Sequence, residues 1–286
     1  MAAELPCGRW IEVRGLALHV IEIGTRGTPT LLLHGGGPGC SARSDFGAVA
    51  GLLAQGRRLI LVDLPQYGDS DSPDITEPVF SFHAAHVLAL LDALGVDRAD
   101  FVCQSLGGSV ALCLAARHPG RVDRLVVTGS QPVLPPKSLP QDNPLASRVR
   151  EEYYGNGGPS LSKMRALMTR LEWHDPAGPP AETVALRFAH STSPRALRLG
   201  TDRSRRGAPE DLTDVLAQVE APVLLLWGAS DPFCGPEYAL ALAARLSRVD
   251  VSVLGRTSHH PGEERPAHYA RLVDAFLADG AAPTHS

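Results

Sequence analysis

The sequence predicts an α/β protein in which a mostly parallel sheet is covered by helices on both faces and interrupted by a helical insertion. Three observations lead to this fold class. Apolar segments of strand length alternate with turns and helical segments over residues 16–128. The alternation stops after Thr128, where the chain becomes proline-rich and then helical. It resumes near residue 222 and continues to residue 277, so we expect a single interrupted core.

The first part of the core is expected to contain five strands and two helices. Each strand is a short apolar segment that ends at a turn or a polar residue. The predicted strands are residues 16–23, 30–33, 59–63, 101–103 and 122–128. The predicted helices are residues 82–94, which end at Gly95, and residues 109–117, which end at His118. Successive strand–turn–helix units imply parallel strands buried on both faces.

The same sequence patterns predict the elements of the insertion and of the last part of the core. Five prolines between Pro132 and Pro144 break any regular element, and residues 145–216 then show helical spacing with few strand signals. The core resumes with predicted strands at residues 222–227 and 249–254 and predicted helices at residues 237–246 and 268–277. We therefore expect a core formed by residues 1–132 and 216–286, with a helical cap, or lid, at residues 133–215.

Composition narrows the class of protein. The chain has 286 residues, of which 44% are hydrophobic and 20% charged, with a formal charge of −4. These values are typical of a globular enzyme and give no field that attracts nucleic acid or a membrane surface. No signal peptide or apolar segment of membrane-spanning length is visible. The five cysteines are scattered, which favours a reducing cytoplasm over a disulfide framework or a zinc site.

The sequence Cys103-Gln-Ser-Leu-Gly107 joins a predicted strand to a predicted helix. Such a setting is typical of a nucleophile elbow, a tight turn that presents a serine hydroxyl above the sheet. Small residues must flank the serine because strand and helix backbones approach closely. Cys103 replaces the usual first glycine and is small enough for the turn. It is not expected to be the nucleophile, because the turn directs Ser105 outward. A plain strand–helix turn is the alternative interpretation.

Two further residues favour a catalytic role for Ser105. Asp231 lies just past the strand at 222–227, and His259 follows the next strand. Enzymes that use such an elbow carry their triad in the order serine, acid, histidine. Serine is a weak nucleophile unless a base takes its proton and an acid orients that base. We therefore predict a Ser105–His259–Asp231 triad, with His259 rather than its neighbour His260 as the base.

A glycine-rich segment, His34-Gly-Gly-Gly-Pro-Gly39, follows an early strand. It can offer backbone N–H groups to an oxyanion, and we assign Gly36 and Leu106 as the two donors. A turn without this role is the alternative. A phosphate-binding loop is disfavoured because no Gly-Lys-Ser/Thr follows. His83 and His86 share a predicted helix, but no carboxylate set accompanies them, so neither a metal nor an organic cofactor is expected.

Taken together, these motifs resemble the meta-cleavage-product hydrolases, carbon–carbon bond hydrolases of the α/β-hydrolase superfamily. The resemblance covers nearly the whole chain. It consists of HGGGPG at 34–39, LVDLPQYGDSD at 61–71, QSLGG at 104–108, WGASDPF at 227–233, the tail SHH…RLVDAFL, and, in the cap, KMRALMTRLEWHDP at 163–176 and ALRFAHS at 185–191. It implies an α/β-hydrolase fold and a substrate that is a ring-fission dienoate or another vinylogous diketone.

The resemblance also implies roles for residues around the substrate. Arg187 matches a cap arginine placed near the substrate carboxylate, where a guanidinium suits bidentate binding. Gly37 belongs to the loop beside the reacting carbonyl. The chain departs from the family at three further substrate-binding positions, with Asp45 and Gln104 where asparagine is usual and His260 where tryptophan is usual. An Asp at position 45 would repel a carboxylate unless Arg187 neutralised it, so these departures bear on the substrate.

Charge in the cap points to the kind of partner. Eleven Lys or Arg and six Asp or Glu lie between Arg148 and Arg206. This surplus is either a solvated surface or a positive lid that attracts an anionic small molecule. Nucleic acid and membrane partners are not expected, and a homo-oligomer remains open.

Two functions other than carbon–carbon bond hydrolysis stay open as well. One is ester, lactone or thioester hydrolysis by the same triad, and the other is a ligand receptor with little turnover.

Overall fold

The computed structural model describes residues 5–140 and 144–278. Its main sheet has eight strands in the order β1-β2-β4-β3-β6-β7-β9-β10. The strands are β1 (Arg9–Val13), β2 (Leu16–Ile23), β3 (Pro29–Leu33), β4 (Arg58–Val62), β6 (Ala99–Gln104), β7 (Val122–Thr128), β9 (Val223–Gly228) and β10 (Val249–Leu254). Pairing is parallel from β4 to β10, and antiparallel between β1 and β2 and between β2 and β4. The expected mostly parallel α/β-hydrolase sheet is confirmed.

Helices cover both faces of the sheet. One face carries α3 (Val79–Ala93), α4 (Leu106–Arg117) and α9 (Pro236–Ala243), and the other carries α1 (Ala42–Phe46), α2 (Ala50–Leu53) and α11 (Pro266–Ala278). Successive strand residues supply the two layers, as Leu31 and Leu33 pack on the first face while Leu32 packs on the second. Burial on both faces explains why the central strands β3, β4 and β9 are mostly apolar.

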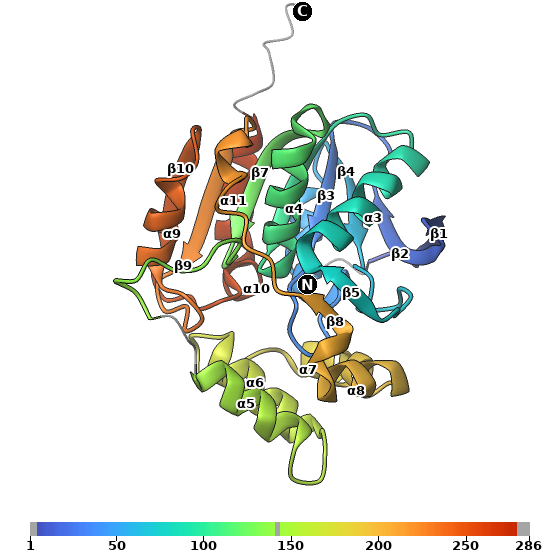
Figure 1. Cartoon of the computed structure of the whole chain (residues 1–286), viewed down its shortest axis with the longest axis vertical. Coiled ribbons are helices and arrows are strands. Elements are labelled where there is room, and N and C mark those ends of the chain that lie inside the picture. The colour runs from blue at the N-terminus through green and yellow to red at the C-terminus, as the bar shows by residue number, and fades with distance from the viewer. Residues whose placement is uncertain (1–4, 141–143, 279–286) are drawn as a thin grey trace, which may run out of the picture.

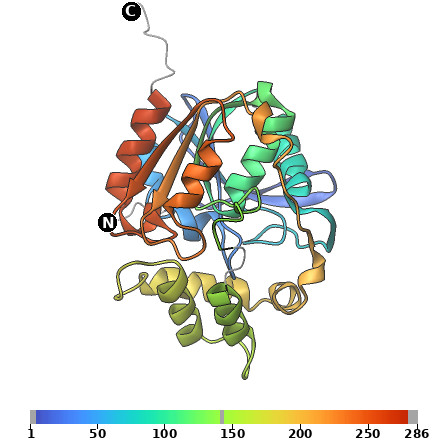
Figure 2. The ribbon, with the colours of Figure 1, turned by 60° about the vertical axis from the view of Figure 1, so that its left-hand side comes forward.

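The cap forms a separate layer at one end of the sheet (Figures 1 and 2). It contains α5 (Pro144–Tyr154), α6 (Leu161–Leu171), α7 (Ala181–Ser191) and α8 (Pro194–Thr201), all within the predicted insertion. Its buried side chains form a cluster of their own, which consists of Val149, Tyr153, Met164, Leu167, Met168, Leu171 and Val184. The chain returns through β8 (Arg206–Ala208), which pairs with β5 (Ile75–Pro78) of the core. The exact limits at 133 and 215 stay a prediction.

Several short elements were not expected from the sequence. They are β1, β5, β8, α1, α2 and α10 (Pro261–Glu264), together with three single turns of 3-10 helix at Pro119–Arg121, Arg203–Arg205 and Leu216–Gln218. Each is too short to show a periodic pattern. None of the helices in the described part of the chain is long and apolar enough to cross a membrane.

Candidate active site

Ser105 occupies the turn between β6 and α4 in a strained conformation. Its backbone angles are φ 50° and ψ −114°, a region that non-glycine residues rarely adopt. The Ser105 N–H donates to the carbonyl of Thr128 on β7 at 2.7 Å, which ties the turn to the neighbouring strand. A side chain at Gly107 would place its Cβ 2.1 Å from the Leu33 carbonyl oxygen. The close approach of α4 to β3 therefore requires glycine there, as expected for an elbow.

Cys103, the residue that replaces the first glycine of the motif, lies inside β6 and is fully buried. Burial raises the pKa of its thiol well above the usual range. A buried neutral thiol is a poor nucleophile. The structure therefore places Cys103 in the core, away from the position that Ser105 takes at the end of the strand.

Asp231 and His259 meet beyond the ends of β9 and β10. The Nδ1 atom of His259 lies 2.7 Å from Oδ2 of Asp231, and Oδ1 of Asp231 accepts a hydrogen bond from the Phe233 N–H at 2.9 Å. Both side chains are buried. Gly129 lies against this pair in a left-handed conformation, and a Cβ there would be 2.7 Å from Cε1 of His259. The pairing leaves Nε2 of His259 as the nitrogen that can exchange a proton.

Ser105 and His259 line one cavity of about 180 Å³. The other lining residues are Gly35, Gly36, Gly37, Cys40, Arg150, Glu172, Phe233 and His260. The Phe233 ring lies 4.4 Å from that of His259, centroid to centroid, and shields it. Core loops supply Ser105 and His259, while α5 and the end of α6 supply Arg150 and Glu172. The cavity therefore lies between core and cap.

Two backbone N–H groups near Ser105 lack an acceptor among the described residues, that of Gly36, which lines the cavity, and that of Leu106, which follows Ser105 in the chain. The two residues are close together, because a Cβ on Gly36 would be 3.3 Å from that of Leu106. Buried N–H groups are normally paired. Two unpaired donors beside Ser105 suit an oxyanion that forms during the reaction.

His34 holds the glycine loop in place, a role that the sequence did not reveal. Its Nδ1–H donates to the Gly35 carbonyl at 2.7 Å, and its Nε2 accepts from the Leu64 N–H at 3.0 Å. Because one nitrogen donates and the other accepts, the imidazole is the neutral Nδ1–H tautomer. The loop that carries Gly36 is thereby fixed to the segment after β4.

Asp45 supports the same loop from behind the cavity. Its Oδ2 accepts from the Gly35 N–H at 2.8 Å, and its Oδ1 accepts from the Ser44 hydroxyl at 2.6 Å. Burial would raise the pKa of Asp45, but the charges of His260 and Arg187 outweigh it, so the pKa lies below its usual value. Asp45 does not line the cavity. Its expected contact with substrate stays a prediction, whereas its contact with the oxyanion loop is direct.

Gln104 does not lie at the cavity, where it was expected to contact substrate. Its Nε2 donates to the backbone carbonyl of His259 at 2.7 Å, which fixes the loop that carries His259. It is buried and does not line the cavity. Of the predicted substrate-binding residues, the structure thus brings Gly37 and His260 to the cavity and places Gln104 and Asp45 one layer behind it.

His260 is a buried cation. Its Nδ1 lies 2.7 Å from Oε1 of Glu263, and its Nε2 lies 3.7 Å from Oε2 of Glu172. Burial lowers the pKa of His260, but these two carboxylates overcome the effect and raise it to about 9. Burial raises the pKa of Glu263 to about 7, since its pairing with His260 offsets only part of the effect. The oxygen and nitrogen atoms of Asp45, His260 and Glu263 that could bind a metal ion lie within 4.8 Å of one another, and the negative charge of Asp45 also favours the protonated form of His260.

Arg187 is placed differently from the expectation. Its Nη1 and Nη2 each lie 3.0 Å from an oxygen of Glu172, and its Nε donates to the Pro38 carbonyl at 2.8 Å. The side chain is fully buried and does not line the cavity. Glu172, and not Asp45, is its partner. The guanidinium fork is therefore occupied, and a contact between Arg187 and substrate would require Glu172 to move.

Glu172 and Glu263 are among the residues of this region that sequence reasoning missed. A signal for Glu263 existed, because a histidine in a site usually filled by tryptophan needs a polar partner, and Glu263 follows His260 by three residues. No comparable signal identified Glu172, which lies in the cap. Its partners Arg187 and His260 are brought to it only by the tertiary fold.

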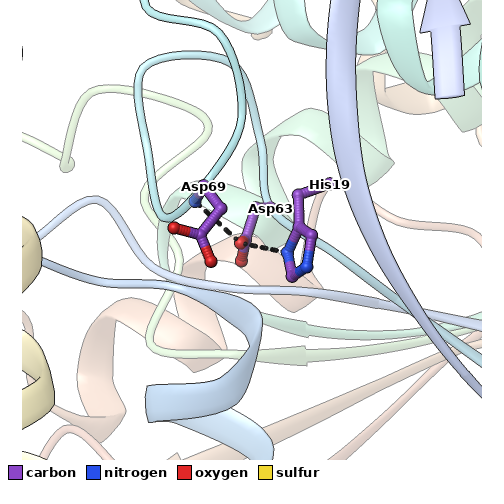
Figure 3. A group of neighbouring side chains, drawn as sticks. All are labelled: His19, Asp63 and Asp69. Atoms are coloured by element: carbon purple, nitrogen blue, oxygen red, sulfur yellow. Dashed lines mark hydrogen bonds and ion pairs between the residues drawn. The ribbon is translucent and has the colours of Figure 1, made fainter. Parts of the chain in front are cut away.

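A second group of titratable residues, His19, Asp63 and Asp69, does not line the cavity. Figure 3 shows how their side chains lie together. The Oδ2 of Asp63 is 2.9 Å from Nδ1 of His19 and also accepts from the Asp69 N–H at 3.1 Å. Its Oδ1 accepts from the Ala42 N–H at 2.7 Å. The hydrogen bond to Asp63 raises the pKa of His19. These donors occupy both Asp63 oxygens, so the group acts as an anchor for the loops after β3 and β4.

Comparison with known proteins identifies the family to which this chain belongs. A family model described as the alpha/beta hydrolase fold matches residues 29–266. The chain is 32% identical over 284 residues to a 2-hydroxymuconate semialdehyde hydrolase from Pseudomonas sp. (strain CF600), covering 95% of this chain and 94% of that protein. It is 29% identical to a 2-hydroxy-6-oxononadienedioate/2-hydroxy-6-oxononatrienedioate hydrolase from Burkholderia vietnamiensis, with 92% and 91% covered.

A solved structure gives the same result. The 2-hydroxy-6-oxo-6-phenylhexa-2,4-dienoate hydrolase from Rhodococcus sp. strain RHA1 superposes with a TM-score of 0.80 at 25% identity, covering 96% of this chain and 99% of that one. The matches extend through the cap as well as the core, and the cavity holds an acid–base pair beside a serine at an elbow. The chain belongs to the α/β-hydrolase fold family, among the meta-cleavage-product hydrolases.

Proposed function

We propose that this hydrolase cleaves a carbon–carbon bond in a ring-fission dienoate or a similar vinylogous diketone, with Ser105, His259 and Asp231 as its triad. The observation that carries the proposal is the cavity itself. Ser105 and His259 line it, Nδ1 of His259 lies 2.7 Å from Asp231, and the neighbouring Gly36 and Leu106 N–H groups have no acceptor among the described residues. The relatives named above act on dienoates or on a muconate semialdehyde.

In this proposal, each residue of the site has a role that follows from its position. His259 takes a proton through Nε2, because Nδ1 is engaged by Asp231. Ser105 is the group that His259 activates, either to attack the carbonyl or to position water for that attack. The Gly36 and Leu106 N–H groups then bind the oxygen that becomes negative.

Cleavage of a carbon–carbon bond requires that the departing electron pair be delocalised. The dienol of the substrate first becomes a ketone by moving a proton to carbon, which leaves a conjugated carbonyl. Water or Ser105 then adds to the second carbonyl. When the carbon–carbon bond breaks, its electrons enter the conjugated system and the resulting dienolate takes up a proton. With water supplying the acyl oxygen, the products are a carboxylic acid and a hydroxydienoate.

Ester hydrolysis is the second candidate, and one observation favours it. Three features expected to bind the dienoate are used within the protein, since Arg187 pairs with Glu172, Gln104 bonds the His259 carbonyl and Asp45 bonds Gly35. A simple ester needs only the nucleophile, the base and the oxyanion donors. The same cavity could therefore serve a neutral acyl substrate.

A direct assay separates the two candidates. Purified protein is mixed with 2-hydroxy-6-oxohepta-2,4-dienoate, and loss of the conjugated chromophore is followed beside release of 4-nitrophenol from 4-nitrophenyl acetate. Carbon–carbon hydrolysis predicts a kcat/KM for the dienoate well above that for the ester, with acetate as a product. Ester turnover alone would overturn the first candidate, and turnover of neither substrate would leave the ligand receptor as the remaining function.

The proposal also includes a cellular setting. The five cysteines are unpaired, which supports a reducing, cytoplasmic setting as part of the proposal.

A further inference from the structure

Arg150, on α5 of the cap, lines the cavity that contains Ser105 and His259. Its side chain is partly buried, yet it forms no hydrogen bond or ion pair with any residue in the described part of the chain. Burial lowers the pKa of Arg150, and the positive charges of Arg206 and Arg203 lower it further. An arginine is nevertheless charged at neutral pH. A charged guanidinium in such a place normally has an anionic partner.

Most of the other basic residues of the cap differ from Arg150 in this respect, because carboxylates or backbone carbonyls hold them at hydrogen-bonding distance. These pairs are Arg170 with Glu152, Arg187 with Glu172, Arg198 and Arg205 with Asp74, and Lys163 with the carbonyls of Gly155, Asn156 and Gly158. The positive surplus of the cap is therefore not a uniform surface charge.

Arg206 strengthens the positive charge beside Arg150. Its Nη2 donates to the Tyr67 hydroxyl at 2.7 Å and lies 3.4 Å from the Gly36 carbonyl oxygen, without a carboxylate partner among the described residues. It approaches from β8, where the chain returns to the core. Two arginines that lack carboxylate partners thus lie near the glycine loop, and only Arg150 reaches the cavity wall.

The remaining charges of the cavity wall are compensated within the protein. Glu172 is bound by both terminal nitrogens of Arg187, and His260 pairs with Glu263 and Glu172. Arg150 is the charge on this wall for which the described residues supply no counterion. The cavity therefore favours a ligand that brings a negative charge to the cap side while its reacting carbon faces Ser105.

We propose that Arg150, backed by Arg206, is the anion-binding residue of the cavity and recognises a substrate carboxylate remote from the bond that is cleaved. The proposal rests on the proposed function in that the substrate must enter this cavity with its carbonyl at Ser105. A guanidinium matches a carboxylate with two parallel hydrogen bonds, and no residue that the structure describes occupies the fork of Arg150. The fork of Arg187 is already filled by Glu172. Substrates are then acyl compounds with an acid group at the far end.

Two matched aryl esters test this assignment. Mono-4-nitrophenyl adipate and 4-nitrophenyl hexanoate have acyl chains of equal length and differ in ending with a carboxylate or a methyl group. Arg150→Gln is expected to raise KM for the adipate ester by about tenfold to a hundredfold, as loss of a charge-assisted pair predicts, and to change hexanoate hydrolysis less than threefold. Arg150→Lys should recover part of the loss, because it restores charge without the fork.

The control variant is Arg148→Gln on the same helix, since Arg148 is exposed and two residues away. It should leave both esters unchanged, which separates a local contact from a general change in cap charge. Equal effects of Arg150→Gln on the two esters, or no effect on either, would overturn the assignment. A circular dichroism spectrum and a melting curve check that each variant keeps its fold.

A binding measurement keeps the test independent of turnover. Calorimetric titration of the Ser105→Ala protein with adipate should give a dissociation constant that rises at least tenfold when Arg150→Gln is added. Unchanged binding, or no binding of adipate before that substitution, would refute the anion site. If adipate binding depends on Arg150 while neither ester nor dienoate is turned over, the proposed function fails and the anion site stands.

Discussion

Ser105 combines a strained backbone with an otherwise ordinary side chain. A non-glycine residue in this conformation costs on the order of 1–3 kcal/mol, which the surrounding sheet and helix must offset. The hydrogen bond from its N–H to Thr128 and the contact of Gly107 with Leu33 are what hold the turn. Because backbone contacts hold the turn, removing the hydroxyl should leave the conformation unchanged.

Ser105→Ala is therefore expected to lower kcat by about 10⁴- to 10⁶-fold while the melting temperature stays close to that of the wild type. His259→Ala should lower kcat to a similar extent, because the two groups act as a unit. Steady-state kinetics on whichever substrate the wild type turns over provides the measurement. A folded Ser105→Ala protein with near wild-type turnover would disprove the nucleophile assignment.

His260 should make stability depend on pH. Its pKa of about 9 in the folded protein exceeds the unfolded value of 6.5, so the folded state holds the proton more tightly. The resulting stabilisation is fully present below pH 6.5 and is lost as pH rises through about 9. At its largest it amounts to about 3 kcal/mol. Urea unfolding of the wild type and His260→Ala should show a difference in free energy that shrinks between pH 6.5 and 9.5.

The control for this measurement is His118→Ala, because His118 is exposed at the end of α4. Its unfolding free energy should run parallel to that of the wild type across the same pH range. If the difference between wild type and His260→Ala stays constant with pH, His260 is not held as a cation by Glu172 and Glu263.

At the scale of elements, the packing of α4 against β3 decides where the nucleophile lies. Gly107→Ala would bring Cβ to 2.1 Å from the Leu33 carbonyl oxygen, so helix and strand must separate. We expect a loss of about 1–3 kcal/mol in unfolding free energy, together with a fall in kcat from the displaced Ser105. Gly120→Ala is the matched control, since a Cβ there meets no atom within 4 Å and should be tolerated. Equal stability of the two variants would contradict this account of the elbow.

The core elements and the order of the candidate triad could be predicted from sequence because both are local. The ends of β6 and β9 and the loop after β10 each carry one residue of the proposed triad, and the strand pattern locates those ends. The contacts of the cap could not be predicted in this way. Arg148 and Arg150 are equivalent in the sequence of α5, and only the placement of that helix distinguishes the exposed one from the one at the cavity. The partner of Arg187 likewise depends on how α6 ends.

At the scale of the whole molecule, the size of the cavity between core and cap limits the substrate. Its volume of about 180 Å³ is below the roughly 300–1,000 Å³ that is usual for drug-sized ligands. We expect a dienoate with a small group at carbon 6, such as methyl, to give a kcat/KM at least tenfold above that of the 6-phenyl compound. Parallel kinetics on the two dienoates provides the check. A preference for the phenyl compound would mean that the cavity enlarges on binding.

The cap also has a buried cluster separate from the two clusters of the sheet, built around Tyr153, Met164 and Met168. Regions with their own core tend to open as cooperative units at a lower free energy than the whole protein. Amide hydrogens of α5–α8 would then exchange with solvent by a sub-global opening that leaves the sheet protected. Such an opening would let substrate in without disturbing Ser105. It would also allow the cap to diverge in evolution, changing which acids are accepted while the chemistry of the core stays constant.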